Sequence, residues 1–203
     1  MILGAAGVAA AALICLDPGH GTVPAIGAQT EPIAPGSHVM KIKDGGGAPG
    51  EAPVALAIAF KLRPLLLRDG YRVAMTRTRD GYRGGNIARA QFCNTRHAAL
   101  MLRIHADGSA DAATHGISTL YKRGDRHAAV LVQRALVRAT GAADRGVVLR
   151  TDLTGFNWAT VPAILVETGF MSNPRERALL RSARYEETVA RGLAAGVSAF
   201  VRP

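Results

Sequence analysis

Three apolar, β-rich runs of this chain each lead directly to a histidine or a glutamate. The runs read LICLDPGHG at 13–21, LMLRIHADGS at 100–109 and AILVETGFMSNP at 163–174. If they form neighbouring parallel strands, His20, His105 and Glu167 meet at one edge of one sheet, where open α/β sheets bind their ligands. Two imidazoles and a carboxylate at a common edge predict a metal-dependent hydrolase site.

Strand-like and helix-like segments alternate along the chain. Apolar spacing predicts helices at 51–68, 85–97 and 128–140 and two more near the C terminus, and β-rich runs predict strands at 13–16, 72–76, 100–104, 116–121, 147–149 and 163–166. This order indicates an α/β fold, a single three-layer domain with a mainly parallel twisted sheet of about six strands and helices on both faces. Residues 21–50 carry Gly and Pro throughout without a period, which predicts an unusually long loop.

The charge of the chain constrains its partners. Twenty-five basic and fifteen acidic residues give a net charge of +10, so an anionic partner is expected, either nucleic acid or an anionic cell envelope. Aromatic residues make up only 5% of the chain, and no base-stacking motif is present. These two observations disfavour single-stranded nucleic acid, and we expect no nucleic-acid partner.

The N-terminal residues and the two cysteines bear on the compartment. Residues 1–12 are apolar and small, and we interpret them as a signal remnant or lead-in before a domain at 13–203, although they lack a basic start. No run is long enough for a transmembrane helix. Cys15 and Cys93 are too few for a disulfide framework and are interpreted as buried small hydrophobes. A bridge between them is the less favoured alternative, because it requires a close Cα approach.

The spacing of polar residues suggests a ligand set. A catalytic zinc site needs three protein ligands and one open position for water. His20 and His105 supply two nitrogens. The candidates for the third ligand are nearby acids or histidines: Glu31, His38, Asp44 and Glu51. We favour Glu51, because it opens a helix that should pack on the same sheet, whereas the others lie on the long loop.

The roles of the other polar residues near the strand ends are predicted less specifically. Glu167 ends an apolar run, where a lone buried carboxylate would be costly without a metal or a basic group beside it. Asp17 and Asp107 each lie close to a proposed ligand, and we expect them either to accept from the distal nitrogen of a bound imidazole or simply to form turns. Arg77 is interpreted as a structural residue that holds a carboxylate or a strand end.

Five motifs in order resemble one family. LDPGHG, the helix start at Glu51, GYRVAMTR, RIHADGS and PAILVETGFMSNP are similar to motifs of the zinc-dependent N-acetylmuramoyl-L-alanine amidases, the type 3 amidases that cleave peptidoglycan. The likeness covers roughly residues 13–200, and the ordered set is specific although no single motif is.

The resemblance implies a site and a reaction. It implies that Zn²⁺ is held by His20, Glu51 and His105 and that Glu167 is the catalytic carboxylate. The implied reaction is hydrolysis of the amide between the lactyl group of N-acetylmuramic acid and L-alanine, by a zinc-activated water with Glu167 as general base. The similarity of VLRTDLTGFNWATVPAILVE to small single-domain members also implies that Arg150 and Asn157 line the substrate groove.

The surroundings of this site follow from the same resemblance. Gated members carry an inserted helix over the zinc, but here Tyr121 runs through KRGD into the next helix, which predicts an open site unless loop 21–50 acts as a lid. We expect a secreted or wall-associated monomer that acts on peptidoglycan, with its charge attracted to anionic wall polymers. The alternatives are another zinc peptidase acting on wall peptides, although HExxH is absent, and a non-catalytic wall-binding protein.

Overall fold

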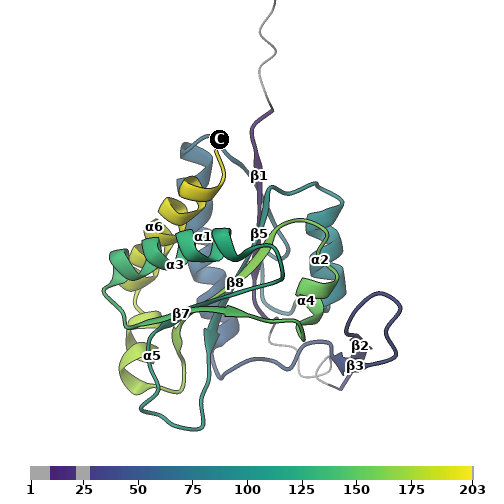
Figure 1. The fold of residues 1–203 in the computed structure, drawn as a ribbon. Helices are drawn as coiled ribbons and strands as arrows, with labels where there is room; N and C mark the ends of the chain where they lie inside the picture. Colours follow the sequence, from purple (N-terminus) through teal and green to yellow (C-terminus); the bar gives the residue numbers. More distant parts are fainter. Residues whose placement is uncertain (1–9, 22–27, 203) are drawn as a thin grey trace, which may run out of the picture.

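Six strands form one sheet in the order β4-β1-β5-β8-β6-β7 in the computed structural model, which describes residues 10–21 and 28–202 (Figure 1). The strands are β1 (Leu13–Pro18), β4 (Arg72–Met75), β5 (Leu100–Asp107), β6 (Ile117–Tyr121), β7 (Asp144–Leu149) and β8 (Ala163–Phe170). Every neighbouring pair is parallel except β6 and β8, which are antiparallel. The predicted six-stranded, mainly parallel sheet is confirmed.

Helices cover both faces of this sheet, as the alternating pattern predicts (Figure 1). The helices are α1 (Glu51–Arg68), α2 (Asn86–Asn94), α3 (Arg126–Thr140), α4 (Thr154–Asn157), α5 (Pro174–Leu180) and α6 (Ala183–Phe200). Helices α1, α3 and α6 bury their apolar stripes against one face, while α2 and α4 pack a smaller cluster on the other. β6 ends at Tyr121 and α3 begins at Arg126, so the short connection predicted there is confirmed.

The strands that carry His105 and Glu167 extend further than their apolar runs. β5 continues to Asp107 and β8 continues to Phe170, and the two stay paired with His105 opposite Glu167. The apolar runs stop at residues 104 and 166 and predict strand ends there. Backbone hydrogen bonds do not require apolar side chains, so the ladder continues across the polar residues. His105 and Glu167 are therefore fixed by the sheet and do not lie in loops.

The long segment before α1 contains a small hairpin. β2 (Thr30–Pro32) and β3 (Met40–Ile42) pair antiparallel, so the prediction of a loop without secondary structure is wrong for this part. Trp158 Nε1 donates to the carbonyl of Pro32 at 3.0 Å and docks the hairpin beside α4. Strands of three residues are too short to produce a detectable alternation. Residues 22–27 of the predicted loop lie outside the described residues.

The two cysteines form a disulfide. Cys15 on β1 and Cys93 on α2 are bonded with their Cα atoms 5.7 Å apart, and both are fully buried. The prediction that both cysteines are buried is confirmed, but the less favoured alternative, a bridge between them, is the one that the structure contains. The bridge spans 78 residues of sequence. In the chain-entropy model, a cross-link of that span lowers the entropy of the unfolded chain and so stabilises the folded state by about 4–5 kcal/mol. It ties the central sheet to the helix on its less covered face.

The start of the domain agrees with the predicted first strand. β1 begins at Leu13, while residues 1–9 of the predicted lead-in lie outside the described residues. Across residues 10–21 and 28–202, the helices are too short or too polar for a bilayer crossing.

Candidate metal centre

His20 follows the end of β1 in a turn that points its ring over the sheet edge. Its φ of 55° lies in the left-handed region, which is uncommon for a residue other than glycine. The preceding Gly19 leaves room for the ring of His105, because a Cβ at this position would collide with that ring. The backbone at 19–20 is therefore shaped to bring the two imidazoles together.

Glu51 and His105 come from rigid elements. Glu51 is the first residue of α1, the position that the sequence favoured, and its carboxylate is buried. Its Oε2 accepts from the backbone N–H of Ala48 at 2.8 Å, and its Oε1 accepts from that of Ala106 at 3.2 Å. His105 lies on β5 and is also buried. These bonds orient the carboxylate toward the end of the sheet.

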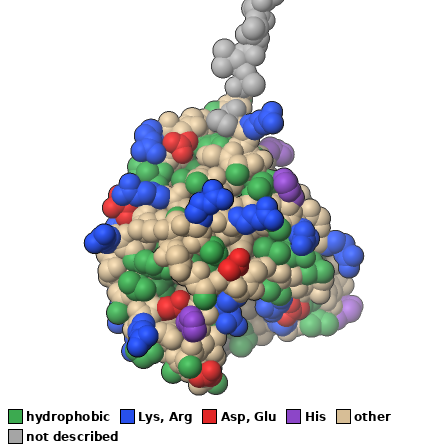
Figure 2. Space-filling view, turned by 60° about the vertical axis from the view of Figure 1, so that its left-hand side comes forward, with side chains coloured by type: hydrophobic (Ala, Val, Ile, Leu, Met, Phe, Trp, Pro, Cys, Tyr) green, Lys and Arg blue, Asp and Glu red, His purple; other side chains and the backbone are tan. Residues whose placement is uncertain are grey.

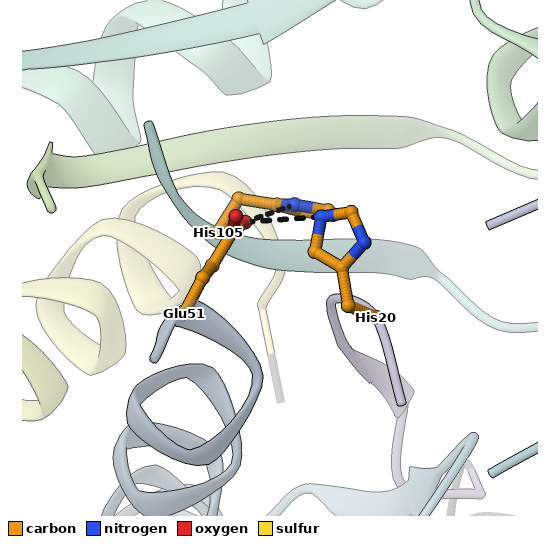
Figure 3. A group of neighbouring side chains, drawn as sticks. All are labelled: His20, Glu51 and His105. Atoms are coloured by element: carbon orange, nitrogen blue, oxygen red, sulfur yellow. Dashed lines mark hydrogen bonds and ion pairs between the residues drawn. The ribbon is translucent and has the colours of Figure 1, made fainter. Parts of the chain in front are cut away.

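The three side chains converge on one point (Figure 3). Glu51 Oε1 lies 3.2 Å from His20 Nε2 and 2.8 Å from His105 Nδ1. The two rings are roughly perpendicular, with centroids 4.9 Å apart. One nitrogen or oxygen from each residue lies within 4.8 Å of the others, which suits a single divalent ion. We call His20, Glu51 and His105 the His–Glu–His cluster.

The charges in the His–Glu–His cluster favour a bound cation. Burial alone would raise the pKa of Glu51, but hydrogen bonds to His105 and His20 outweigh it and hold the pKa well below its usual range. Burial alone would lower the pKa of His20, but its bonds to Asp44 and Glu51 raise it to about 9. Burial lowers the pKa of His105. The proton on His20 supplies the positive charge that the buried Glu51 carboxylate needs, and a divalent ion held by these three residues would take the place of that proton.

Glu167 stands beside this cluster on β8. It lies opposite His105 on one side and Ser118 of β6 on the other. Its Oε2 is buried without a hydrogen-bond partner among the described residues, and the same holds for His105 Nε2. Burial, together with the charges of Glu51 and Asp107, raises the pKa of Glu167 well above its usual range. A nearby cation would offset both causes and favour the carboxylate.

The remaining third-ligand candidates have other partners. Asp44 Oδ1 lies 2.6 Å from His20 Nδ1 and fixes the orientation of that ring. Glu31 accepts from the backbone N–H groups of Asn86 and Ile87 and so caps the start of α2. His38 is exposed on the hairpin. The sequence had named Asp44 only as a ligand, and its position within a Gly-rich turn carried no signal for the role it has.

Asp17 and Asp107 do not have the imidazole contact expected of them. Asp17 is fully buried and accepts from Arg89 at 2.7 Å, from Arg103 at 2.8 Å and from Thr76 at 2.6 Å. Its side chain lies on the face of β1 that α2 covers, where Arg89 and Arg103 bind it. The Asp107 carboxylate accepts from the backbone N–H of Gly108. Within the described part of the chain, the acid bonded to a distal imidazole nitrogen is Asp44.

A groove leads away from the His–Glu–His cluster. A small hollow beside His20 and His105 shares Arg103 with a second hollow, which shares Arg150 with a third of about 450 Å³. We call these three hollows the basic groove. Two of them share Arg150, which forms a bidentate pair with Asp152 at 2.7 and 2.9 Å. Asn157 instead donates to the carbonyls of Ile33 and Thr151 and holds the hairpin segment in place.

Comparison with known proteins agrees with this geometry. The family model described as N-acetylmuramoyl-L-alanine amidase matches residues 14–199. An N-acetylmuramoyl-L-alanine amidase of Mycobacterium tuberculosis is 31% identical over 70% of this chain and 65% of its own length. The germination-specific N-acetylmuramoyl-L-alanine amidase of Bacillus subtilis is 27% identical over 91% of this chain and 78% of its own length.

Solved structures show the same fold. The N-acetylmuramyl-L-alanine amidase Ami1 of Mycobacterium abscessus, in its apo form, superposes with a TM-score of 0.85 at 27% identity, over 95% of this chain and 99% of that chain. Ami1 of Mycobacterium smegmatis gives 0.84 at 27% identity, over 94% and 97%. Since the family model covers nearly the whole sequence, this chain belongs to the N-acetylmuramoyl-L-alanine amidase family.

Proposed function

We propose that this protein is a zinc-dependent N-acetylmuramoyl-L-alanine amidase whose catalytic domain spans residues 13–203. The substrate bond is the amide between the lactyl group of N-acetylmuramic acid and L-alanine in peptidoglycan. The observation that carries the proposal is the convergence of His20, Glu51 and His105 around one point beside the unpartnered carboxylate of Glu167. Family membership independently supports the same chemistry.

The His–Glu–His cluster suits zinc in particular. Two imidazole nitrogens and one carboxylate oxygen form a three-ligand set that leaves one position open for water or substrate. Such an ion supplies Lewis acidity, lowering the pKa of a water and polarising a carbonyl oxygen. The chain contributes the fixed directions of the ligands: the sheet holds His105, the helix start holds Glu51, and Asp44 holds the ring of His20.

Glu167 performs the proton transfers. Its buried Oε2 is free to accept a proton from the attacking water as a general base. The same carboxyl group then delivers this proton to the nitrogen of the departing L-alanine. An amide requires this second step, because an amine anion is a very poor leaving group. One carboxylate therefore serves both steps without a second acid.

The basic groove is the proposed path of the substrate. The stem peptides of peptidoglycan carry free carboxylates, and the groove is lined by Arg150, Lys41 and Lys43. Arg150 lies where two hollows of the groove meet, which supports its proposed contact with substrate. Asn157 is proposed to act indirectly, by fixing the hairpin wall next to the groove.

We also propose that the protein is secreted or wall-associated and acts as a monomer. The Cys15–Cys93 disulfide supports export, because such bonds persist in oxidising environments. The net charge of +10 suits attraction to anionic wall polymers.

The assignment of roles is tested by two variants measured for zinc content and for hydrolysis. Glu167→Ala should bind zinc as wild type but lose turnover by about 10²–10⁴-fold or more, the usual contribution of a positioned general base. His105→Ala should lose both zinc and activity. Glu187→Ala, at an exposed position on α6, serves as the control and should match wild type.

Each alternative gives a different outcome. Full activity in Glu167→Ala would overturn the proposed base. Zinc-dependent cleavage of stem peptides with the lactyl amide left intact would identify another zinc peptidase. Binding to walls without cleavage, unaffected by a chelator, would identify a non-catalytic wall-binding protein.

A further inference from the structure

The chain around His20 leaves the sheet, and its backbone carbonyls are bound by two guanidinium groups. Pro18 O accepts from Arg77 Nε at 3.0 Å and from Arg89 Nη1 at 2.7 Å. Gly19 O accepts from Arg77 Nη2 at 2.8 Å, and His20 O accepts from Arg89 Nη2 at 2.7 Å. Three successive carbonyls, at the last residue of β1 and just beyond it, are thus held by side chains from distant parts of the sequence.

Arg77 also donates from Nη1 to the carbonyl of Arg79 and to Asp80 Oδ1, both at 3.4 Å, and it reaches a helix that Arg89 does not. Its Nη2 also donates to the carbonyl of Ala52 at 2.7 Å, in the first turn of α1 and next to Glu51. The Arg77 side chain is fully inaccessible to solvent. One buried guanidinium therefore joins the segment that carries His20 to the helix start that carries Glu51.

We propose that Arg77 is a positioning residue that sets the metal affinity of the His–Glu–His cluster by holding these two segments at a fixed separation. The inference rests on the proposed function, because it takes His20 and Glu51 to be metal ligands. It assigns Arg77 no contact with the metal or the substrate.

The need for such a link follows from how the ligands are supported. His105 is fixed by pairing on both sides of β5, whereas His20 lies beyond the end of β1. Ligand distances must be correct to within about 0.2 Å for a metal to bind tightly. A planar guanidinium with five N–H donors reaches carbonyls on two segments at once, which the single ammonium of lysine does not reproduce.

The charge of Arg77 is retained in this setting. Burial lowers its pKa to about 10, so the group stays protonated at neutral pH. A buried cation near a metal site would be unfavourable without compensation. Here the carbonyls of Pro18, Gly19 and Ala52 turn their negative ends toward the guanidinium, and the carboxylate of Asp80 lies 3.4 Å from its Nη1, so together they supply it.

The experiment measures zinc affinity directly, by competition between apo-protein and a chromogenic chelator. Arg77→Met should raise the zinc dissociation constant by about 10–100-fold, the usual effect of removing a group that orients metal ligands. Arg77→Lys should show a smaller but measurable loss of zinc affinity, because lysine keeps the positive charge but lacks the planar set of N–H donors. With zinc in excess, both variants should recover much of their hydrolytic rate.

A destabilised control separates positioning from general loss of stability. Leu62→Ala removes a fully buried side chain of the same helix, three turns away from Glu51. Its zinc dissociation constant should stay within about 3-fold of wild type, even though such core truncations are strongly destabilising.

The outcomes are distinct. An unchanged dissociation constant in folded Arg77→Met, or an equal loss in Leu62→Ala, overturns the inference. If Arg77→Met does not fold, Arg77→Lys decides, and wild-type affinity in that variant overturns it. A wild-type protein that binds no zinc contradicts the proposed function itself and the inference with it.

Discussion

At the scale of single residues, the close packing of the His–Glu–His cluster depends on two glycines. Gly19 leaves space for the ring of His105, and Gly47 leaves space for the carboxylate of Glu51 and the ring of His20. Gly47 also has a φ of +69°, a conformation that side chains with a Cβ rarely adopt. The close approach of the ligands therefore requires glycine at these positions.

Gly47→Ala should disrupt the His–Glu–His cluster, because the new methyl group collides with two of the three ligands. We expect zinc affinity to fall by about 10-fold or more, comparable to the loss of an orienting partner. Gly45→Ala is the matched control in the same turn, where a Cβ would meet no atom within 4 Å. Competition with a chelator measures both variants. Equal affinities in the two would contradict this account of the close approach.

The sequence predicts residues better when they lie on regular elements. Glu51 was favoured because it opens a helix with clear apolar spacing, and it does open α1. Nearness in sequence suggests Asp17 and Asp107 as imidazole partners, with turn formation as the alternative role, yet His20 pairs with Asp44, 24 residues away. Hydrogen bonds across that separation depend on how a loop folds back, and residue spacing does not encode this.

At the scale of elements, a buried charge network holds three pieces of the fold together. Asp17 of β1 accepts from Arg103 of β5 and from Arg89 of α2. Burial alone would raise the pKa of Asp17, but Arg89 and Arg103, with the hydrogen bond from Thr76, hold it well below its usual range. Breaking a buried pair by removing one partner is costly, because it leaves the other charge uncompensated.

This network predicts how stability depends on pH. A carboxylate whose pKa is lowered by folding stabilises the folded state above its unfolded pKa of about 3.9, and this contribution is lost as the pH falls below that value. Asp17→Asn should lower the free energy of unfolding at pH 7 by about 3–5 kcal/mol. Its stability should also depend less on pH in the acid range. Denaturant unfolding at several pH values measures both, and parallel curves for variant and wild type would refute the role.

The sequence predicts elements with a strong apolar period well, but it does not predict very short strands or the disulfide bridge. Apolar spacing predicts the bounds of α1, and β-rich runs predict that the sheet has six strands, although β1, β5, β7 and β8 are longer than those runs. The β2–β3 hairpin has strands of three residues, so it gives no periodic signal. The Cys15–Cys93 bridge joins β1 to α2 over 78 residues, and only the packed tertiary structure reveals that the two residues are close.

At the scale of the whole molecule, the excess of positive charge is the dominant feature of the surface. Lys and Arg side chains are spread over the face shown in Figure 2 and are not gathered into one patch. With a net charge of +10, this distribution favours attraction to an extended polyanion over docking at a single site. Wall polymers with repeated negative charges match it.

Binding to cell walls should therefore weaken as salt increases. Electrostatic attraction is screened over about 10 Å at 0.1 M salt and about 3 Å at 1 M, so we expect a several-fold loss of wall binding across this range. Sedimentation with purified walls measures it, using Glu167→Ala so that the walls are not digested during the assay. Binding that stays constant from low to high salt would exclude charge as the source of attraction.

The most direct test of the whole account is mass analysis of peptidoglycan digested by the zinc-loaded protein. The proposed function predicts intact glycan strands with free lactyl carboxyl groups on muramic acid, together with released stem peptides that begin at L-alanine. Addition of a chelator should abolish both products. Cut glycan strands, or stem peptides cleaved beyond an intact lactyl–alanine bond, would contradict the assignment.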